Sequence, residues 1–155
     1  MNIRLAQDKD LHVIVEFNRA MALETEGKNL ILEVVTKGVT NLLAQPQRGF
    51  YVVAEVDSVS VGSLMITTEW SDWRDGDFWW IQSVYVKPEF RKLGVYRAMY
   101  AFVQSLAVTQ PNVCGFRLYV ERENVTAQKT YAALGMQETH YNIFESLKPG
   151  IRFLE

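Results

Sequence analysis

The chain has 155 residues and a formal net charge of −2, with 48% hydrophobic and 22% charged residues. This length predicts a single domain, residues 1–155, that can bury a core without metals or disulfides. The charge argues against a basic nucleic-acid surface, and Cys114, alone in the chain, excludes an internal disulfide. No window has the roughly 18 apolar residues of a membrane span. The N-terminal stretch lacks a signal-type apolar run, so we expect a cytoplasmic protein without membrane contact.

The first half of the chain predicts a strand, two helices and a pair of strands. Residues 2–6 alternate as a strand. A helix that opens at Asp8 or Asp10 then carries apolar residues at helical spacing until Gly27 interrupts it. A second helix is expected over about 30–45. Residues 50–56 and 59–70 predict two strands joined by a short turn at Asp57 and Ser58.

Residues 77–86 predict a central strand, because both of its faces are largely apolar. Simple alternation would place Gln82 on one face and Ser83 and Tyr85 on the other. A helix of about four turns follows from Val95 and ends before Pro111.

The last part of the chain predicts three strands and a helix. A strand is expected over 115–121, and a helix capped by Asn124 should run to Leu134, with Gly135 just beyond its end. Residues 136–144 and 151–155 predict two closing strands.

A cation-rich loop separates the expected central strand from the next helix. Residues 87–97 contain four Lys or Arg side chains and one acid, a local charge of +3. The N–H groups of the first helical turn, the helix dipole and the freedom of Gly94 together predict a phosphate site. A solvated basic turn explains this stretch equally well by itself. The glycine pattern matches neither a P-loop nor a dinucleotide-binding fingerprint.

A second motif, residues 118–136, predicts a strand, a polar loop, an asparagine and a helix with a central tyrosine. Together with the loop Arg91-Lys92-Leu93-Gly94-Val95-Tyr96, it resembles the GNAT superfamily of acyl-CoA-dependent N-acyltransferases. The family loop reads Gln/Arg-x-x-Gly-x-Gly/Ala. The family's next motif is Asn, then an Ala- and Tyr-bearing helix that ends in Leu-Gly-Phe/Met, here Asn124, Ala127, Tyr131, Leu134, Gly135 and Met136. The resemblance spans nearly the whole chain and specifies the superfamily, not the substrate.

The resemblance implies an α/β (α+β) fold with a mixed, mostly antiparallel twisted sheet of about seven strands and about four helices. Two central strands should splay apart at a bulge, where the pantetheine arm of CoA pairs with exposed backbone. The residues that the resemblance assigns to the cofactor are Val84, Tyr85, Val86, Arg91, Lys92, Leu93, Gly94, Val95, Tyr96, Asn124 and Ala127. Tyr96 departs from the family's Gly or Ala, so its ring should point away from the phosphates, toward the helix flank.

Acyl transfer to an amine needs a neutral amine and a proton for the departing thiolate. An alkylamine with a pKa of about 10.4 is neutral about once in 2,500 molecules at pH 7, so the site should contain a proton acceptor. The resemblance places Tyr131 near the thioester sulfur as the proton donor. Its pKa of about 10 suits a thiolate of pKa near 8.5. The alternative for Tyr131 is a half-buried aromatic on an amphipathic helix.

The proton acceptor is less clearly indicated. Many family members carry a glutamate on the central strand where this chain has Trp80, and the nearby Gln82 is no base. We therefore expect a water-relayed base, with Glu69 and Asp72 as the candidates.

An acidic, aromatic segment predicts the acceptor site. Residues 69–77 contain four acids and one arginine, a net charge of −3, which suits a cationic amine. We expect Trp70 and Trp73 at the mouth of the acceptor pocket and Trp79 and Trp80 in the core. Two glutamates between the first two helices, Glu24 and Glu26, would face the same mouth if the family layout holds.

The sequence therefore predicts an N-acetyltransferase that uses acetyl-CoA. Direct attack in a ternary complex would transfer the acetyl group to a small cationic amine or a peptide amine. The alternative is an acyl-CoA-binding regulatory module with weak or no catalysis, which the missing strand glutamate keeps open. No metal site is indicated by the His, Cys and Asp spacing. Dimerisation through the closing strands is common in the superfamily, so a homodimer stays open beside a monomer.

Overall fold

The computed structural model describes all residues from Met1 to Glu155, arranged in two compact units. The first unit comprises Met1–Leu118 and Phe153–Glu155, and it holds the sheet and three α-helices. The second unit, Tyr119–Arg152, holds one helix and the segment that follows it. None of the helices has the length and hydrophobicity that crossing a bilayer requires.

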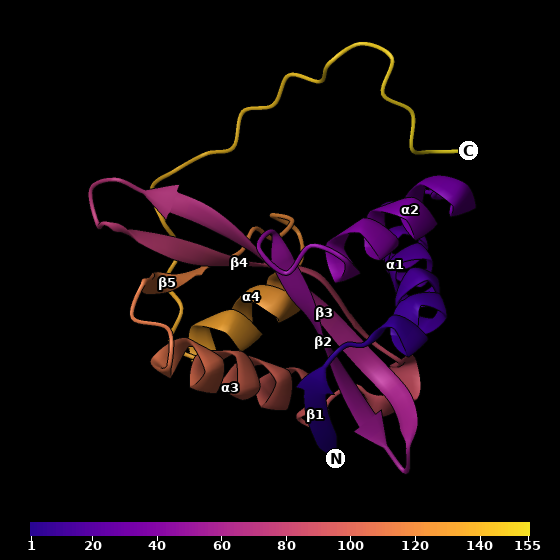
Figure 1. The fold of residues 1–155 in the computed structure, drawn as a ribbon, viewed down its shortest axis with the longest axis horizontal. Helices are drawn as coiled ribbons and strands as arrows, with labels where there is room; N and C mark the ends of the chain where they lie inside the picture. Colours follow the sequence, from indigo (N-terminus) through magenta and orange to yellow (C-terminus); the bar gives the residue numbers. More distant parts are fainter. The chain divides into compact units, whose positions relative to one another are not determined.

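The first unit is built on a single sheet of five strands in the order β1-β2-β3-β4-β5 (Figure 1). The strands are β1 (Asn2–Leu5), β2 (Gly49–Val56), β3 (Val59–Ser71), β4 (Gly76–Val86) and β5 (Val113–Arg117). Neighbours from β1 to β4 are antiparallel, whereas β5 is parallel to β4. The expected mixed, mostly antiparallel sheet is thereby confirmed, with five strands in place of about seven.

The two closing strands expected over 136–144 and 151–155 do not form. Near the C-terminus only Leu154 makes a strand-like bridge, with Leu30. The preceding strand is also shorter than expected, because β5 ends at Arg117 and does not continue to residue 121. A segment forms a strand only where a partner edge supplies hydrogen bonds for its backbone.

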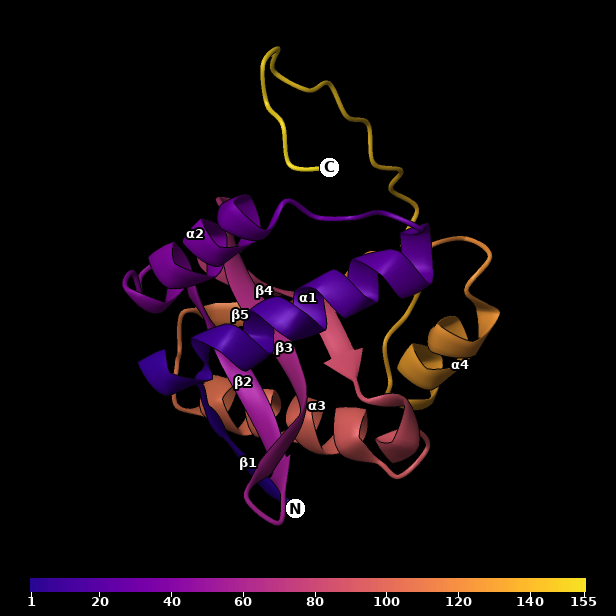
Figure 2. The same cartoon turned by 90° about the vertical axis from the view of Figure 1, so that its right-hand side faces the viewer.

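Four α-helices accompany the sheet: α1 (Leu11–Glu26), α2 (Leu32–Leu43), α3 (Val95–Val108) and α4 (Val125–Ala133). Two 3-10 turns, η1 (Asp8–Asp10) and η2 (Pro88–Phe90), precede α1 and α3. Gly27 ends α1 in the left-handed conformation that glycine adopts most easily. Figures 1 and 2 show α1 and α2 on one face of the sheet and α3 on the other.

Side chains at alternating positions of the inner strands pack into two apolar layers, one on each face of the sheet. On the side of α1 and α2, Tyr51 and Val53 of β2 form a buried cluster with Ile14 of α1 and Val39 of α2. The alternate residues of β2, such as Val52, are fully buried on the opposite face. The sheet is therefore covered on both faces, as the apolar composition of its strands predicts.

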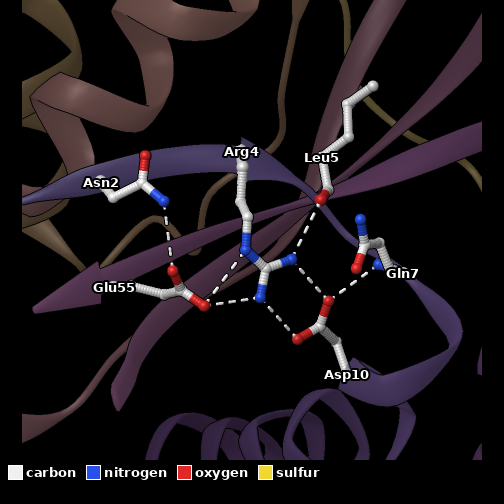
Figure 3. Close-up of polar contacts among 6 residues, drawn as sticks. All are labelled: Asn2, Arg4, Leu5, Gln7, Asp10 and Glu55. Carbon is white, nitrogen blue, oxygen red and sulfur yellow. Dashed lines mark hydrogen bonds and ion pairs between the residues drawn. The ribbon is translucent and has the colours of Figure 1, made fainter. Parts of the chain in front are cut away.

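Arg4 on β1 ties the first strand to the start of α1 and to β2 (Figure 3). Its guanidinium donates to both Asp10 oxygens, at 2.7 and 2.9 Å, and to Glu55 Oε1 at 2.6 and 3.1 Å. Asp10 also accepts the Gln7 backbone N–H at 2.8 Å. Hydrogen bonds from Arg4 hold the pKa values of the Asp10 and Glu55 carboxyls below their usual range. This cluster fixes where α1 begins, and so where Glu24 near its end can lie.

Candidate active site

The central strand β4 loses its neighbour β5 halfway along its length. Parallel pairing with β5 covers Asp77 to Trp80, whereas β4 continues to Val86 in contact with β3. Residues 81–86 therefore have no strand partner on the β5 side. A strand edge of this kind can bind an extended ligand through backbone hydrogen bonds. The expected splay of two central strands is present at this place.

A β-bulge at Ser83 interrupts the same stretch of β4. Between the pairs Met65–Gln82 and Ser63–Tyr85, β3 advances by two residues and β4 by three. Ser83 itself has a φ of 50°, unusual for a residue with a Cβ. Because one extra residue reverses the alternation, Tyr85 shares a face with Gln82. Simple alternation had placed these two residues on opposite faces, and the bulge corrects that expectation.

Because of the bulge, the Tyr85 side chain packs against the C-terminal half of α1. Its ring lies 5.1 Å from the Phe17 ring, and its hydroxyl is 3.5 Å from Glu24 Oε1. Burial, together with the nearby Glu24 charge, raises the pKa of Tyr85. The bulge thus joins the free end of β4 to the helix that carries Glu24.

The loop after β4 has the geometry of an anion site. Lys92 and Gly94 are both left-handed, with φ values of 63° and 81°. No side chain caps α3, and its hydrogen-bond ladder begins with Ala98 N–H donating to the Gly94 carbonyl at 3.0 Å. The N–H groups of Gly94 and Val95 precede that ladder. Together with the helix dipole, such groups favour an anion.

Tyr96, the departure from the family pattern, leaves the start of α3 open. Its ring stacks on Tyr100, with centroids 6.2 Å apart and planes inclined by 6°. Tyr100 lies one turn further along α3, so the Tyr96 ring follows the helix flank. The expected orientation of this side chain is confirmed.

Arg91 joins residues that the sequence assigned to three different roles. Its guanidinium donates to Glu24 Oε2 at 2.7 Å and to the Val86 carbonyl at 2.8 Å, and it lies 5.5 Å from the Tyr85 ring centroid. Glu24 was expected at the acceptor, Val86 at the pantetheine arm and Arg91 at the diphosphate. Sequence reasoning missed this connection because Glu24 and Arg91 are 67 residues apart.

The structure does not bring Glu69 to the bulge. Glu69 pairs with Arg117 of β5 at 2.5 Å, and the Arg117 guanidinium lies 3.7 Å from the Phe78 ring centroid. Glu69 is also opposite Phe78 in the ladder. Ser83 is five positions beyond Phe78 along β4, about 16 Å away at roughly 3.3 Å per residue.

The turn between β3 and β4 holds the other acidic and aromatic candidates. The Asp72 carboxylate accepts the Trp73 backbone N–H at 2.9 Å, which is a contact within the turn. Trp70 is 59% exposed and Trp73 87% exposed. Since Trp70 pairs with Asp77, six residues from Ser83, this turn also lies far from the bulge along β4. Of the two tryptophans expected in the core, Trp79 is buried, whereas Trp80 is only half-buried.

Glu26, the other expected acceptor residue, binds a neighbour in sequence. Its carboxylate accepts from Lys28 Nζ at 3.1 Å, just beyond the end of α1. Glu24 and Glu26 therefore lie near each other along the chain but have different partners. Of the expected carboxylates, Glu24 contacts both the end of β4 and the cationic loop.

Two buried polar oxygens, on α1 and β3, were not among the site residues expected from the sequence. Asn18 Oδ1 on α1 and Ser63 Oγ on β3 are buried and have no hydrogen-bond partner in the protein. Ser63 is opposite Tyr85, and Gln82 donates to Thr67 Oγ1 at 2.6 Å. Buried oxygens without protein partners are typical positions for ordered water. One signal was available, since Asn18 interrupts an otherwise apolar helix stripe.

The second unit carries the remaining expected site residues on α4. Asn124 precedes the helix, and its side chain accepts the Ala127 backbone N–H at 3.2 Å, so the expected cap is confirmed. Gly135 follows the helix with a φ of 92°, as expected for a glycine at that position. Tyr131 lies midway along α4, where burial raises the pKa of its hydroxyl.

The model of the acetyltransferase (GNAT) family matches residues 17–136. A possible acetyltransferase from Clostridium difficile 630 is 44% identical, with a TM-score of 0.88 over 95% of this chain and 97% of that one. Comparison with curated proteins found no match.

Two more distant structures share the fold. An aminoglycoside N-acetyltransferase, AAC(6')-Iy, in complex with CoA is 21% identical, with a TM-score of 0.74 over 95% of this chain and 99% of that one. A Clostridium acetobutylicum protein, itself predicted to be an acetyltransferase, was crystallised with acetyl-CoA. It is 20% identical, with a TM-score of 0.78 over 94% of this chain and 95% of that one. The family-model match and the 44% identical relative show that this chain belongs to the acetyltransferase (GNAT) family.

Proposed function

We propose that the protein is an N-acetyltransferase that transfers the acetyl group of acetyl-CoA to a primary amine. The observation that carries this proposal is the free edge of β4 over residues 81–86, which leads directly into the uncapped start of α3. An extended amide chain that ends in a diphosphate fits both parts at once. Structures of the same fold were crystallised with CoA and with acetyl-CoA.

In this proposal the cofactor lies along β4 and across the loop. The pantetheine amides would pair with backbone groups of Val84 and Val86, while the Tyr85 side chain stays against α1. The diphosphate would receive backbone N–H groups from the loop, Arg91 to Tyr96, and charge from Arg91 and Lys92. On the second unit, the family resemblance assigns Asn124 and Ala127 to the cofactor arm.

Tyr131 is proposed to protonate the departing thiolate. Its pKa is raised by burial, so the hydroxyl keeps its proton at neutral pH and above. The raised pKa also makes Tyr131 a weaker acid than the thiol that forms, whose ordinary pKa is near 8.5, so the donor role rests on the family motif and not on the pKa shift. The carbonyl carbon gains the bond to nitrogen and loses the bond to sulfur, and the thiol leaves as CoA.

Glu24 is proposed to attract the amine once the cofactor is bound. In the present structure its carboxylate is held by Arg91. A diphosphate on the loop would compete for Arg91 and release Glu24 toward a cationic acceptor. Cofactor and acceptor would then bind in order, with the cofactor first.

The proton that the amine loses needs a path. Water bound at the buried oxygens of Asn18 and Ser63 would carry it toward Glu24. Glu69 and Asp72, the candidates expected from sequence, would need a longer relay. Glu69 is paired with Arg117, and Asp72 is bound within its turn.

The test is a thiol-release assay with acetyl-CoA and a panel of small cationic amines and peptide amines. We expect turnover with at least one amine and a large loss of kcat in Tyr131→Phe, whereas CoA affinity is kept. CoA binding without turnover for any amine would favour the second candidate, an acyl-CoA-binding module, which the absence of a β4 glutamate supports. The absence of CoA binding would refute both.

A further inference from the structure

A polar cavity of about 360 Å³ lies in the first unit. It forms where β1, the start of α1, the turn between β2 and β3 and the end of β4 come together. A cavity of this volume can hold a small metabolite. No residue of its lining has a role in the proposed cofactor path or acceptor site. The cavity is therefore a feature that the proposed acyl transfer does not explain.

The two carboxylates of the cavity are bound to Arg4 (Figure 3). Arg4 donates to Asp10 and Glu55 through four hydrogen bonds and to the Leu5 carbonyl through a fifth, which uses all five of its N–H donors. The same hydrogen bonds lower the pKa values of both carboxyls, so both stay charged and bound to Arg4 at neutral pH. A cationic ligand would have to compete with Arg4 for either carboxylate.

The unused hydrogen-bond donors of the cavity belong to two lysines and two serines. Lys9 and Lys87 line it, and neither ammonium group forms an ion pair or a hydrogen bond with the protein. The hydroxyls of Ser58 and Ser60 line it too, and they also have no hydrogen-bond partner in the protein. The whole lining contains three cations and two acids, a net charge of +1. These donors and this charge favour an anion that offers several acceptor oxygens.

The backbone that carries these donors is held in place. The Lys87 N–H donates to the Val61 carbonyl at 2.8 Å, just after the end of β4. Ser60 is paired with Glu55 across the β2–β3 hairpin. Lys9 lies in η1, the turn that the hydrogen bonds of Figure 3 fix at the start of α1. A site on fixed backbone loses less conformational entropy when a ligand binds, so the remaining ordering concerns the side chains.

We propose that this cavity binds the phosphate group of a phosphomonoester, with the two ammonium groups and the two hydroxyls as its donors. A phosphomonoester carries up to two negative charges and three acceptor oxygens, which match two lysines and two hydroxyls. Val13 and Val59, the apolar residues of the lining, would contact the body of the ligand. Two sources can supply such a group, the ribose phosphate of CoA or a separate phosphorylated metabolite. The inference does not depend on acyl transfer and is tested without an amine.

Titration of the full chain with inorganic phosphate at constant ionic strength, followed by amide chemical shifts, is the first test. The amide signals of Ser58, Ser60 and Lys87 should shift and saturate, and Lys9→Gln and Lys87→Gln should each raise the Kd by roughly 5-fold or more. Lys37→Gln is the matched control, because Lys37 is paired on α2 outside the cavity and should leave the Kd unchanged. Shifts that never saturate, or binding indifferent to both cavity lysines, would overturn the proposal. Thermal melts show that each variant is folded.

Dephospho-CoA, which lacks the ribose phosphate, distinguishes the two sources. If CoA supplies the phosphate, Lys87→Gln should weaken CoA by roughly 5-fold but leave dephospho-CoA unchanged, and inorganic phosphate should compete with CoA. If a separate metabolite supplies it, both cofactors should bind Lys87→Gln and the wild type equally, and phosphate should still shift the Ser58 and Ser60 signals with CoA bound. Either pattern supports a phosphate site in the cavity. Equal weakening of CoA and dephospho-CoA, with no phosphate binding, would assign Lys87 to the diphosphate and overturn the proposal.

Discussion

Replacing Glu24 with glutamine should strengthen CoA binding, although the change removes an ion pair. In the unliganded protein, Arg91 is bound to Glu24 at 2.7 Å, and the two side chains are 43% and 41% exposed. An ion pair with this exposure stabilises by about 0.2–1 kcal/mol. Cofactor binding must break it if Arg91 is to reach the diphosphate. Glu24→Gln removes that competition, so CoA affinity should rise by about 1.4- to 5-fold.

Arg91→Ala should have the opposite effect. A hydrogen bond from a charged group contributes about 1.5–3 kcal/mol, from which the lost Glu24 pair must be subtracted. The net loss is about 1–2 kcal/mol, equivalent to roughly 5- to 30-fold weaker CoA binding. In the Arg91→Ala background, Glu24→Gln should have no further effect, because the competing pair is already absent.

Calorimetric titration with CoA at two salt concentrations measures these changes. Glu26→Gln is the matched control, because Glu26 is paired with Lys28 and should leave CoA affinity unchanged. Higher salt should shrink the gain from Glu24→Gln, since an exposed pair is screened. Unchanged or weaker binding in Glu24→Gln, or full additivity in the double variant, would refute the competition between Glu24 and the diphosphate.

Three further predictions concern substitutions of single residues. Tyr131→Phe should lower kcat by about 100-fold or more at unchanged CoA affinity, and an unchanged pre-steady-state rate would rule out the donor role. Gly94→Ala should destabilise the protein by about 1–2 kcal/mol in denaturant titration, because a φ of 81° strains a residue with a Cβ. No atom lies within 4 Å of the added Cβ, so steric clash adds nothing to this cost. Asp10→Asn should lower the free energy of unfolding by about 2–3 kcal/mol, because Arg4 loses its ion pair with the buried Asp10 carboxylate. Since Arg4 holds the Asp10 pKa below its ordinary value of about 3.9, this stabilisation is complete above that pH and disappears as pH falls further. In thermal melts, the stability of Asp10→Asn should therefore fall less between neutral and acid pH than the stability of the wild type.

Local patterns in the sequence predicted most of the fold, including the loop that leads into α3. The order of the elements up to α4, the cap at Asn124 and the orientation of the Tyr96 ring depend on interactions within a few residues. Helix periodicity, capping and glycine conformation are short-range properties, so they can be read from adjacent positions.

The tertiary structure alone decided which polar groups meet. The pair of Arg91 with Glu24 and the pair of Glu69 with Arg117 join distant segments, and nothing in the local pattern points to either. The bulge at Ser83 depends on the pairing register between β4 and β3, and it directs the Tyr85 side chain toward α1. Nothing in residues 136–144 specifies an edge on which a strand could pair. Side-chain period and backbone preference are properties of a segment, whereas pairing and register depend on what the rest of the fold places beside it.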